Sequence, residues 1–309
     1  MKNKRIYIIL NPVAGAGRAK KAMNFLLSAI SDLGRNDCVL LETQGPGDAT
    51  RLAREVAEKG GTLLIAVGGD GTINEVINGL LPARISPAGP CELGIVNCGS
   101  GAGVAQTLGI PAGIKEQVQL IFNKPARALD AGLLTCRDKN GAAVGRYFLN
   151  ECQAGFSGAV VKEVGMAQKR FGGKLAFGMV SISQLFRYKA TQMQVRVDMR
   201  PAVAQKMLGV VIGNGNYCAG GMQLTPGARP GDGYLDVLLM GEMNLPDRLA
   251  SFSRVYSGNH VHARAFSLQK ARTIEIDSEA PVWVETDGEL IGRTPCRIDI
   301  VPGAVWVRY

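Results

Sequence analysis

The sequence predicts two domains: an α/β domain with a doubly wound, mostly parallel sheet over residues 1–126, followed by a mostly antiparallel β-sandwich over residues 127–309. Before Pro125, short apolar runs alternate with segments of helical periodicity, whereas strand-like runs separated by turn residues predominate after it. A length of 309 residues also suits two domains better than one.

The first domain is expected to alternate strands with helices. Its strands are short, uninterrupted apolar runs, typical of strands buried on both faces of a parallel sheet. They lie at Ile6–Leu10, Cys38–Leu41, Leu63–Val67 and Leu93–Val96. Apolar residues at helical spacing predict helices at Lys20–Leu33, Asp48–Lys59, from Ile73, at Val104–Leu108 and at Ile114–Phe122. Ligands of such a sheet bind at the carboxyl ends of its strands.

The second domain is expected to consist mainly of strands, with helical stretches near Lys174–Phe186 and Leu245–Tyr256. Turn residues between the strand-like runs predict an antiparallel sandwich or a partial barrel. The predicted strands are Ala128–Cys136, Tyr147–Ala154, Gln192–Asp198, Leu208–Ile212, Leu235–Met240, Thr273–Ile276, Val282–Glu285, Cys296–Ile300 and Val305–Arg308.

Composition narrows the class of protein. No apolar run reaches the roughly 18 residues that cross a bilayer, and the run after the basic segment Met1–Arg5 is too short for a signal peptide. We therefore expect a cytoplasmic protein. The net charge is +9, but only 6% of residues are aromatic. This favours an anionic membrane surface or a polyphosphate ligand over nucleic acid.

Cysteine and histidine give little sign of metal chemistry. The seven cysteines are scattered and contain no CxxC pair, which is typical of reduced thiols in a cytosolic protein. His260 and His262, the only histidines, would share one face of a predicted strand. Because no cysteine or carboxylate lies close to them in sequence, we expect neither a metal pair nor histidine catalysis.

The most informative segment is the glycine turn Gly68–Thr72, which joins a buried strand to a helix. Its glycines let a backbone approach a bulky anion, and the N–H groups of the helix start favour negative charge. Asp70 would repel a phosphate unless a divalent cation lay between them, as in phosphoryl transfer. The alternative is a tight turn capped by Asp70 and Thr72.

Two further glycine turns end strands at the same predicted edge of the sheet. Asn11–Arg18 follows the first strand, and Asn97–Gly103 follows the strand Leu93–Val96. The spacing fits neither a P-loop nor a dinucleotide fingerprint. Three such turns in one domain nevertheless indicate a nucleotide-binding site and not merely turns that join strands to helices.

These motifs resemble the diacylglycerol kinase catalytic-domain family, which includes bacterial lipid kinases and sphingosine kinases. Gly68–Thr72 alone is shared with NAD kinases and phosphofructokinases, whose fold the resemblance implies for the first domain. The full series keeps its order along nearly the whole chain: Asn11-Pro12 with Gly15 and Gly17, Gly68–Thr72 with Asn74-Glu75, Gly99-Ser100-Gly101, Leu129–Gly132, Phe148–Asn150, Gly155-Phe156, Asn214–Asn216, Gly220–Met222, Pro226, Asp232–Val237 and Asp287–Glu289.

The resemblance implies a kinase that uses ATP and Mg²⁺. Glu289 matches the family's proposed base, with Asp287 close to it, and Asp70 and Asp130 would hold Mg²⁺ and its waters. An ordinary hairpin turn is the alternative for Asp287–Glu289. The residues expected to contact the nucleotide are Asn11, Pro12, Thr43, Gly68, Gly69, Gly71, Thr72, Glu75, Gly99, Ser100 and Gly101.

A second ion site and one departure from the family also follow from the resemblance. Asp232, with the carbonyls of Arg229 and Tyr234, matches a structural Mg²⁺ loop, although Gly231 stands where the family usually has an acidic residue. A simple Asp-Gly turn is the alternative. Ala102-Gly103 replaces the Asn-Asp of many bacterial members and removes a carboxylate expected near the metal or the acceptor.

The implied reaction transfers the γ-phosphoryl group to a hydroxyl of a diacylglycerol-like or sphingoid lipid. The apolar segment Lys169–Lys189, with basic ends, is a candidate for transient peripheral contact with an anionic membrane, although its pattern also suits a core-facing helix. The alternatives are an NAD kinase-like phosphotransferase acting on a soluble nucleotide, and a lipid- or nucleotide-binding regulatory protein without catalysis. The sequence leaves the oligomeric state open, a homodimer included.

Overall fold

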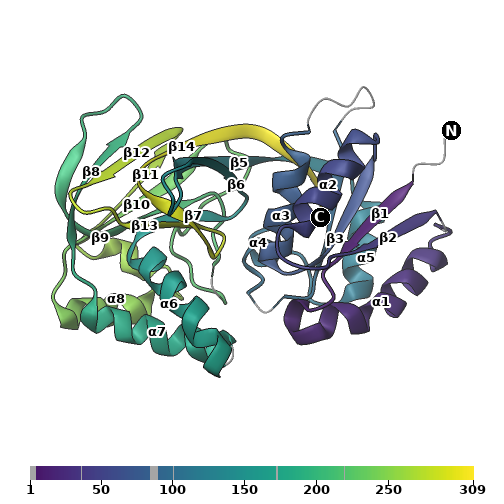
Figure 1. Cartoon of the computed structure of the whole chain (residues 1–309), viewed down its shortest axis with the longest axis horizontal. Helices are drawn as coiled ribbons and strands as arrows, with labels where there is room; N and C mark the ends of the chain where they lie inside the picture. The colour runs from purple at the N-terminus through teal and green to yellow at the C-terminus, as the bar shows by residue number, and fades with distance from the viewer. Residues whose placement is uncertain (1–4, 36, 84–89, 100, 172, 219) are drawn as a thin grey trace. The chain divides into compact units, whose positions relative to one another are not determined.

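The computed structural model describes residues 5–35, 37–83, 90–99, 101–171, 173–218 and 220–309, with the backbone alone for 165–177. The chain forms two compact units (Figure 1). Unit 1 comprises residues 1–131, 219–221 and 302–309, and unit 2 comprises residues 132–218 and 222–301. We predicted 302–309 as part of the C-terminal domain. In the structure Trp306, Val307 and Arg308 of this segment pair with a strand of unit 1, a partner that sequence alone does not reveal.

Unit 1 contains a parallel sheet. β1 (Ile6–Leu10), β2 (Cys38–Glu42), β3 (Leu63–Gly68) and β4 (Glu92–Asn97) lie in the order β4-β3-β1-β2. The end of β14 (Glu289–Arg308) adds a parallel strand beside β4. Every residue of β3 is buried, as its uninterrupted apolar run predicts.

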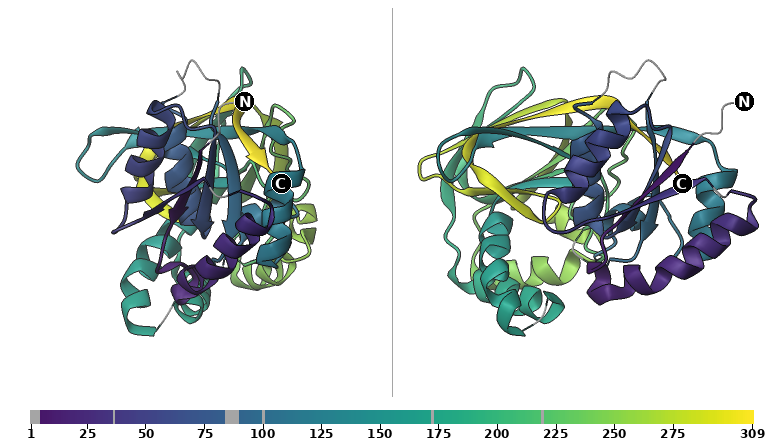
Figure 2. Two further views of the ribbon diagram at one scale, coloured as in Figure 1. Left: turned by 90° about the vertical axis from the view of Figure 1, so that its right-hand side faces the viewer. Right: turned by 45° about the vertical axis from the view of Figure 1, so that its right-hand side comes forward.

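Helices cover the sheet of unit 1 in two pairs (Figures 1 and 2). α1 (Ala14–Asp32) and α5 (Ile114–Asn123) pack against alternate residues of β1 and β3 in one hydrophobic cluster. α2 (Asp48–Glu58) and α3 (Asp70–Leu80) pack against each other and contact β1 and β3, respectively. The short helix α4 (Gly103–Thr107) follows β4.

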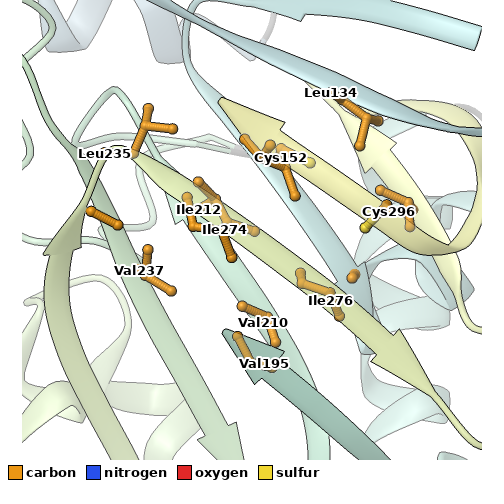
Figure 3. Packing of buried hydrophobic residues seen from close by; sticks show 14 of the residues in the cluster. Leu134, Cys152, Val195, Val210, Ile212, Leu235, Val237, Ile274, Ile276 and Cys296 are labelled. Carbon is orange, nitrogen blue, oxygen red and sulfur yellow. The ribbon is translucent and has the colours of Figure 1, made fainter. Parts of the chain in front are cut away.

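Unit 2 is built from antiparallel strands. Six of its strands pair in a closed circuit, β7-β9-β8-β12-β14-β13 and back to β7. Alternate side chains of these strands form one buried apolar cluster (Figure 3). The strand bounds are β5 (Ala126–Arg137), β6 (Ala143–Phe148), β7 (Glu151–Gly155), β8 (Thr191–Val197), β9 (Val203–Gly213), β10 (Leu235–Gly241), β11 (Phe266–Ala271), β12 (Thr273–Ser278) and β13 (Trp283–Thr286).

The helices of unit 2 are α6 (Phe156–Phe171), α7 (Gly173–Arg187) and α8 (Leu245–Arg254). α6 packs on β7 and β13 and also contacts α7, which in turn contacts α8. Among the described residues, no helix is both long enough and apolar enough to cross a bilayer.

Three local predictions were wrong. The runs Cys296–Ile300 and Val305–Arg308, expected as separate strands, lie in the single strand β14. The run Tyr147–Ala154 is not one strand but the end of β6 and most of β7, because the N–H groups at the corner between them donate to the Asp287 carboxylate. His260 and His262 lie in a 3₁₀ helix rather than a strand. His260 is buried with Nε2 3.2 Å from the Leu224 carbonyl oxygen, and burial lowers its pKa.

Candidate functional site

The carboxyl ends of β1, β3 and β4 bring the three glycine turns of unit 1 into contact. A Cβ on Gly15 would lie 2.0 Å from the carbonyl oxygen of Cys98. A Cβ on Gly99 would lie 2.5 Å from the Cα of Gly69. Only glycine therefore fits where these turns cross, and the turns meet at one edge of the sheet, as the sequence predicts.

Polar side chains link the glycine turns. Asn11 Nδ2 donates to Thr72 Oγ1 at 3.0 Å. Arg18 Nε donates to the carbonyl oxygen of Gly15 and Arg18 Nη2 to that of Gly99, each at 3.1 Å. Sequence analysis did not single out Arg18 as a site residue, and its only signal is its position as the last residue of the first glycine turn. The arrangement places a cation at the crossing of the turns.

The other residues predicted to contact the nucleotide occupy the same strand ends. Gly68, Gly69 and Gly71 form the junction of β3 and α3. Thr43 is buried after β2, and its N–H donates to the Leu10 carbonyl oxygen at 2.9 Å. Pro12 and Gly101 lie in the first and third turns, whereas Ser100 falls outside the described residues.

Asp70 begins α3, and its carboxylate accepts hydrogen bonds from the start of α4. The N–H of Gly103 donates to Oδ2 at 3.0 Å, and the N–H of Val104 donates to Oδ1 at 3.2 Å. Burial raises the pKa of Asp70, although these two amides act in the opposite direction. The Asp70 carboxylate therefore supports the start of α4 as well as carrying charge at the turns.

The same contacts involve Ala102-Gly103, the pair that replaces the Asn-Asp of many bacterial members of the family. Ala102 has a φ of 56°, in the left-handed region, where asparagine is better tolerated than alanine. Gly103 contributes its backbone N–H to Asp70. This chain therefore contacts Asp70 at this turn through a main-chain donor instead of adding a second carboxylate.

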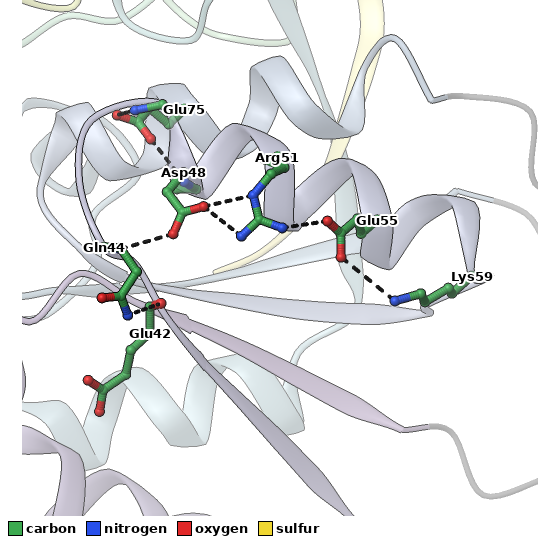
Figure 4. A network of polar contacts seen from close by, with 9 residues as sticks. Glu42, Gln44, Asp48, Arg51, Glu55, Lys59 and Glu75 are labelled. Carbon is green, nitrogen blue, oxygen red and sulfur yellow. Dashed lines mark hydrogen bonds and ion pairs between the residues drawn. The ribbon is translucent and has the colours of Figure 1, made fainter.

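Glu75 has a structural role that the sequence did not indicate (Figure 4). Its Oε1 accepts the N–H of Gly47 at 2.9 Å, and its Oε2 accepts the N–H of Ala49 at 3.1 Å. These donors belong to the start of α2, which leaves amides without intrahelical partners. Nucleotide contact by Glu75 stays a prediction. Asp130, on β5, is also buried, and its Oδ1 accepts the N–H of Gly303 at 2.8 Å.

Within unit 2, Asp287 and Glu289 lie at a two-residue hairpin between β13 and β14. Thr286 pairs with Glu289, and Asp287 and Gly288 have φ values of 48° and 83°. Positive φ at both central residues is the type I′ geometry that an Asp-Gly pair favours. The turn prediction is thus confirmed, and it does not exclude a chemical role.

Arg146, on β6, contacts the predicted base. Its Nη2 lies 2.7 Å from Glu289 Oε2. Arg146 Nε is buried without a hydrogen-bond partner among the described residues. Sequence analysis missed Arg146 because it lies 143 residues away from Glu289 along the chain. A carboxylate that can accept a proton therefore lies beside a cation with one unused donor.

The predicted structural ion site contains a lysine. Asp232 Oδ1 accepts the N–H of Tyr234 at 3.0 Å, and Asp232 Oδ2 lies 2.7 Å from Lys270 Nζ. Lys270 Nζ also lies 3.2 Å from Oδ2 of the buried Asp236. Burial alone would lower the pKa of Lys270, but hydrogen bonds and attraction from the two carboxylates raise it.

The Asp232 carboxylate therefore already has a cation beside it, Lys270 of β11, and both Asp232 oxygens have partners. This geometry fits a lysine-neutralised turn better than a Mg²⁺ ligand set. Among the residues that the structure describes, no group of three or more His, Cys, Asp or Glu side chains is arranged to hold a metal. Metal binding by Arg229, Asp232 and Tyr234 stays a prediction.

Comparison with known proteins gives two family matches. The family described as "Diacylglycerol kinase catalytic domain" matches residues 5–134, and "YegS C-terminal NAD kinase beta sandwich-like domain" matches residues 150–309. The diacylglycerol kinase of Bacillus subtilis (strain 168) is 29% identical over 94% of this chain and 92% of its own length. That of Staphylococcus carnosus (strain TM300) is 28% identical over 94% of this chain and 90% of its own.

Solved structures agree with these matches. A crystal structure from Bacillus anthracis str. Sterne, provisionally named a diacylglycerol kinase, is 26% identical with a TM-score of 0.79 and covers 100% of this chain and 98% of its own. An NAD kinase from Archaeoglobus fulgidus in complex with ATP has a TM-score of 0.50 at 13% identity, over 96% of this chain and 89% of its own. The second likeness shows a shared NAD kinase-like fold.

We expect Asp70→Asn to reduce turnover by at least about a hundredfold, because it removes a charge at the glycine turns. It should also lower the free energy of unfolding by about 1–2 kcal/mol, because an amide cannot accept both N–H groups. Asp198→Asn is the matched control, since Asp198 accepts two backbone N–H groups, from Arg272 and Thr273. Denaturant unfolding and turnover should show a stability loss in both variants and a catalytic loss in Asp70→Asn alone. Wild-type turnover in Asp70→Asn would remove Asp70 from the mechanism.

We expect the melting temperature of the nucleotide-free wild type to be the same in EDTA and in Mg²⁺, because Lys270 already neutralises Asp232. Lys270→Met should melt about 2–4 °C lower in EDTA, the shift for about 1 kcal/mol in a chain of this size. Added Mg²⁺ should restore part of that loss, and Lys270→Arg, which keeps the charge, should resemble the wild type. A wild-type protein that loses stability in EDTA would favour the metal instead.

Proposed function

Since the chain belongs to the diacylglycerol kinase family and is a kinase with an alcohol group as acceptor, we propose that it transfers the γ-phosphoryl group of ATP to a hydroxyl of a diacylglycerol-like lipid. The observation that carries the proposal is the crossing of the three glycine turns. Where no side chain fits, backbone N–H groups can approach the phosphates of a nucleotide.

The charged side chains around these turns suit a nucleoside triphosphate. Arg18 supplies a fixed cation, held by two carbonyl oxygens of the turns. Asp70 supplies a carboxylate, and Asp130 is a second carboxylate of unit 1 that would help to hold Mg²⁺ and its waters. When bound, Mg²⁺ would neutralise charge on the phosphates during transfer.

The residues of unit 2 supply the remaining chemistry. The Glu289 carboxylate would accept the proton of the lipid hydroxyl as that oxygen attacks. Arg146 Nη2 lies 2.7 Å from one oxygen of this carboxylate and holds it in place. Asp287 fixes the turn from which Glu289 projects, through three backbone amides.

The acceptor is assigned first to diacylglycerol, because the curated relatives matched over most of this chain bear that name. A sphingoid lipid is the second choice. Phosphorylation of NAD is supported only by the shared fold of the NAD kinase structures. The Asp70 contact with Gly103 favours catalysis over a lapsed binding protein, because the carboxylate is kept and positioned by this chain's own turn.

Access to a membrane lipid requires a surface that contacts the bilayer, and we propose α7 for it. The side chains of Lys169–Lys174 lie outside those described. In the described part of α7, Met179, Ile182 and Phe186 are 44%, 52% and 56% exposed. Their spacing places them on one face of the helix, and Arg187 and Lys189 are exposed at its end. Apolar side chains beside basic ones suit an anionic surface.

The first test is transfer of label from γ-labelled ATP with Mg²⁺ to mixed micelles that hold diacylglycerol, monoacylglycerol, sphingosine, ceramide, phosphatidylglycerol or undecaprenol, with NAD as a soluble acceptor. We expect labelled diacylglycerol in the wild type and at least about a hundredfold less in Asp70→Asn. Label in NAD alone would assign the protein to the nucleotide kinases. ATP binding without any labelled acceptor from this panel would contradict the proposed function.

We also expect the double substitution Ile182→Ser with Phe186→Ser to weaken binding to phosphatidylglycerol vesicles by about tenfold, because each loses burial of an apolar side chain. Met199→Ser is the control, because Met199 is 99% exposed elsewhere in unit 2. Co-sedimentation with the vesicles at low and at high salt separates the apolar contribution from the electrostatic one, since binding through Arg187 and Lys189 should weaken with salt. Equal binding by the double variant and the wild type would exclude α7 as the docking surface.

A further inference from the structure

Glu285 is a buried carboxylic acid directly behind the hairpin that carries Glu289. It lies on β13 and is 1% exposed. Its Oε2 accepts the N–H of Gly288 at 2.9 Å, and its Oε1 lies 3.1 Å from Ser157 Oγ, at the start of α6. One side chain therefore joins the tip of the hairpin to the helix that covers it.

The Gly288 N–H needs such a partner. In a two-residue hairpin the flanking residues, here Thr286 and Glu289, form the last pair of the ladder, and the N–H of the second turn residue lies outside it. Glu285 is the acceptor that the structure provides for this N–H. Because Gly288 precedes Glu289, the orientation of its peptide bond sets the direction in which Glu289 leaves the turn.

The other anchors of this hairpin act at different atoms. The Asp287 carboxylate holds the N–H groups of Leu149, Asn150 and Glu151, and Arg146 holds the Glu289 carboxylate. Neither of these contacts fixes the Gly288 peptide. Glu285 is thus the one side chain among these anchors that acts on the backbone between Asp287 and Glu289.

We propose that Glu285 is a positioning residue for phosphoryl transfer: through Gly288 N–H it fixes the turn that aims Glu289 at the acceptor hydroxyl. The assignment rests on the proposed function, in which Glu289 is the base. Glu285 touches neither substrate nor Glu289 in this role. Its contribution is geometric, and a displacement of the base by about 1 Å would reduce turnover by about a hundredfold.

The surroundings of Glu285 indicate the protonation state in which it accepts the Gly288 N–H. Burial raises its pKa to about 8, and the charge of Asp287 adds to the rise. The titratable groups around it are Asp287 on its own hairpin, Glu151 and Cys152 on β7, and Cys218. None of the described lysines or arginines forms an ion pair with it. Near pH 7 it is therefore mainly protonated. Glutamine has nearly the same shape and keeps one acceptor oxygen for the Gly288 N–H, with an amide NH2 in place of the acid O–H.

The test compares Glu285→Gln, Glu285→Leu and the matched control Gln153→Leu. Gln153 is a buried polar residue opposite Glu285 in the β7–β13 register, and none of the hydrogen bonds described above joins it to the turn. We expect Glu285→Leu to lower kcat by ten- to a hundredfold with KM for ATP within about twofold of wild type. Glu285→Gln and Gln153→Leu should keep kcat within about threefold. A wild-type kcat in Glu285→Leu, or an equal loss in Gln153→Leu, would overturn the proposal.

Two readouts do not depend on catalysis. Amide hydrogen exchange at Gly288 should accelerate in Glu285→Leu and stay slow in Glu285→Gln, even if no lipid acceptor is found. This separates failure of the positioning role from failure of the proposed function.

Because the folded state keeps a proton on Glu285 that the unfolded state releases, the stability of the wild type should fall as pH rises from the usual glutamate range to about 8. The fall in melting temperature should be smaller in Glu285→Gln, where only the other raised carboxyls such as Asp70 contribute to it. An identical fall in both proteins would contradict a buried protonated acid at Glu285.

Discussion

Carboxylates that accept backbone N–H groups from distant turns hold this structure together where its chemistry is proposed. Asp70 receives the first amides of α4, Glu75 those of α2, and Asp287 those of the β6–β7 corner. Helix starts and corners leave such amides without partners in the regular hydrogen-bond ladders. A hydrogen bond to a charged group contributes about 1.5–3 kcal/mol. Charge and turn geometry therefore change together when one of these residues is altered.

The glycine turns impose the complementary constraint, which is the absence of side chains. Gly15 against Cys98 and Gly69 against Gly99 bring backbone to backbone at distances that no Cβ permits. The resulting surface consists of main-chain groups, with Arg18 and Asp70 as charges set into it. Phosphoryl transfer is mostly a matter of position and electrostatics, so a rigid backbone surface suits it better than flexible side chains.

Local patterns account for what the sequence could predict. The apolar runs of β1, β3 and β4 predicted buried parallel strands, and the glycine turns after them predicted one shared edge. The partners of ionic side chains could not be predicted in this way. Arg146 and Glu289 are separated by 143 residues, and Lys270 and Asp232 by 38. Such pairs are set by the register of antiparallel strands, which no local period encodes. The prediction of one strand over Tyr147–Ala154 was wrong for the same reason. The Asp287 carboxylate, from the distant β13–β14 hairpin, binds the backbone N–H groups at the corner between β6 and β7.

The pairing of β14 with β4 has a consequence for how the protein is made. Arg308 and Glu92, joined by a hydrogen bond within unit 1, are separated by 216 residues. All of unit 2 is synthesised between them, so the nascent sheet of unit 1 carries an open edge on β4 until translation has passed β14. Exposed strand edges invite pairing with other chains, and contacts of such long range form slowly. The growing polypeptide thus passes through a period in which unit 1 has almost all of its elements and is at its most aggregation-prone.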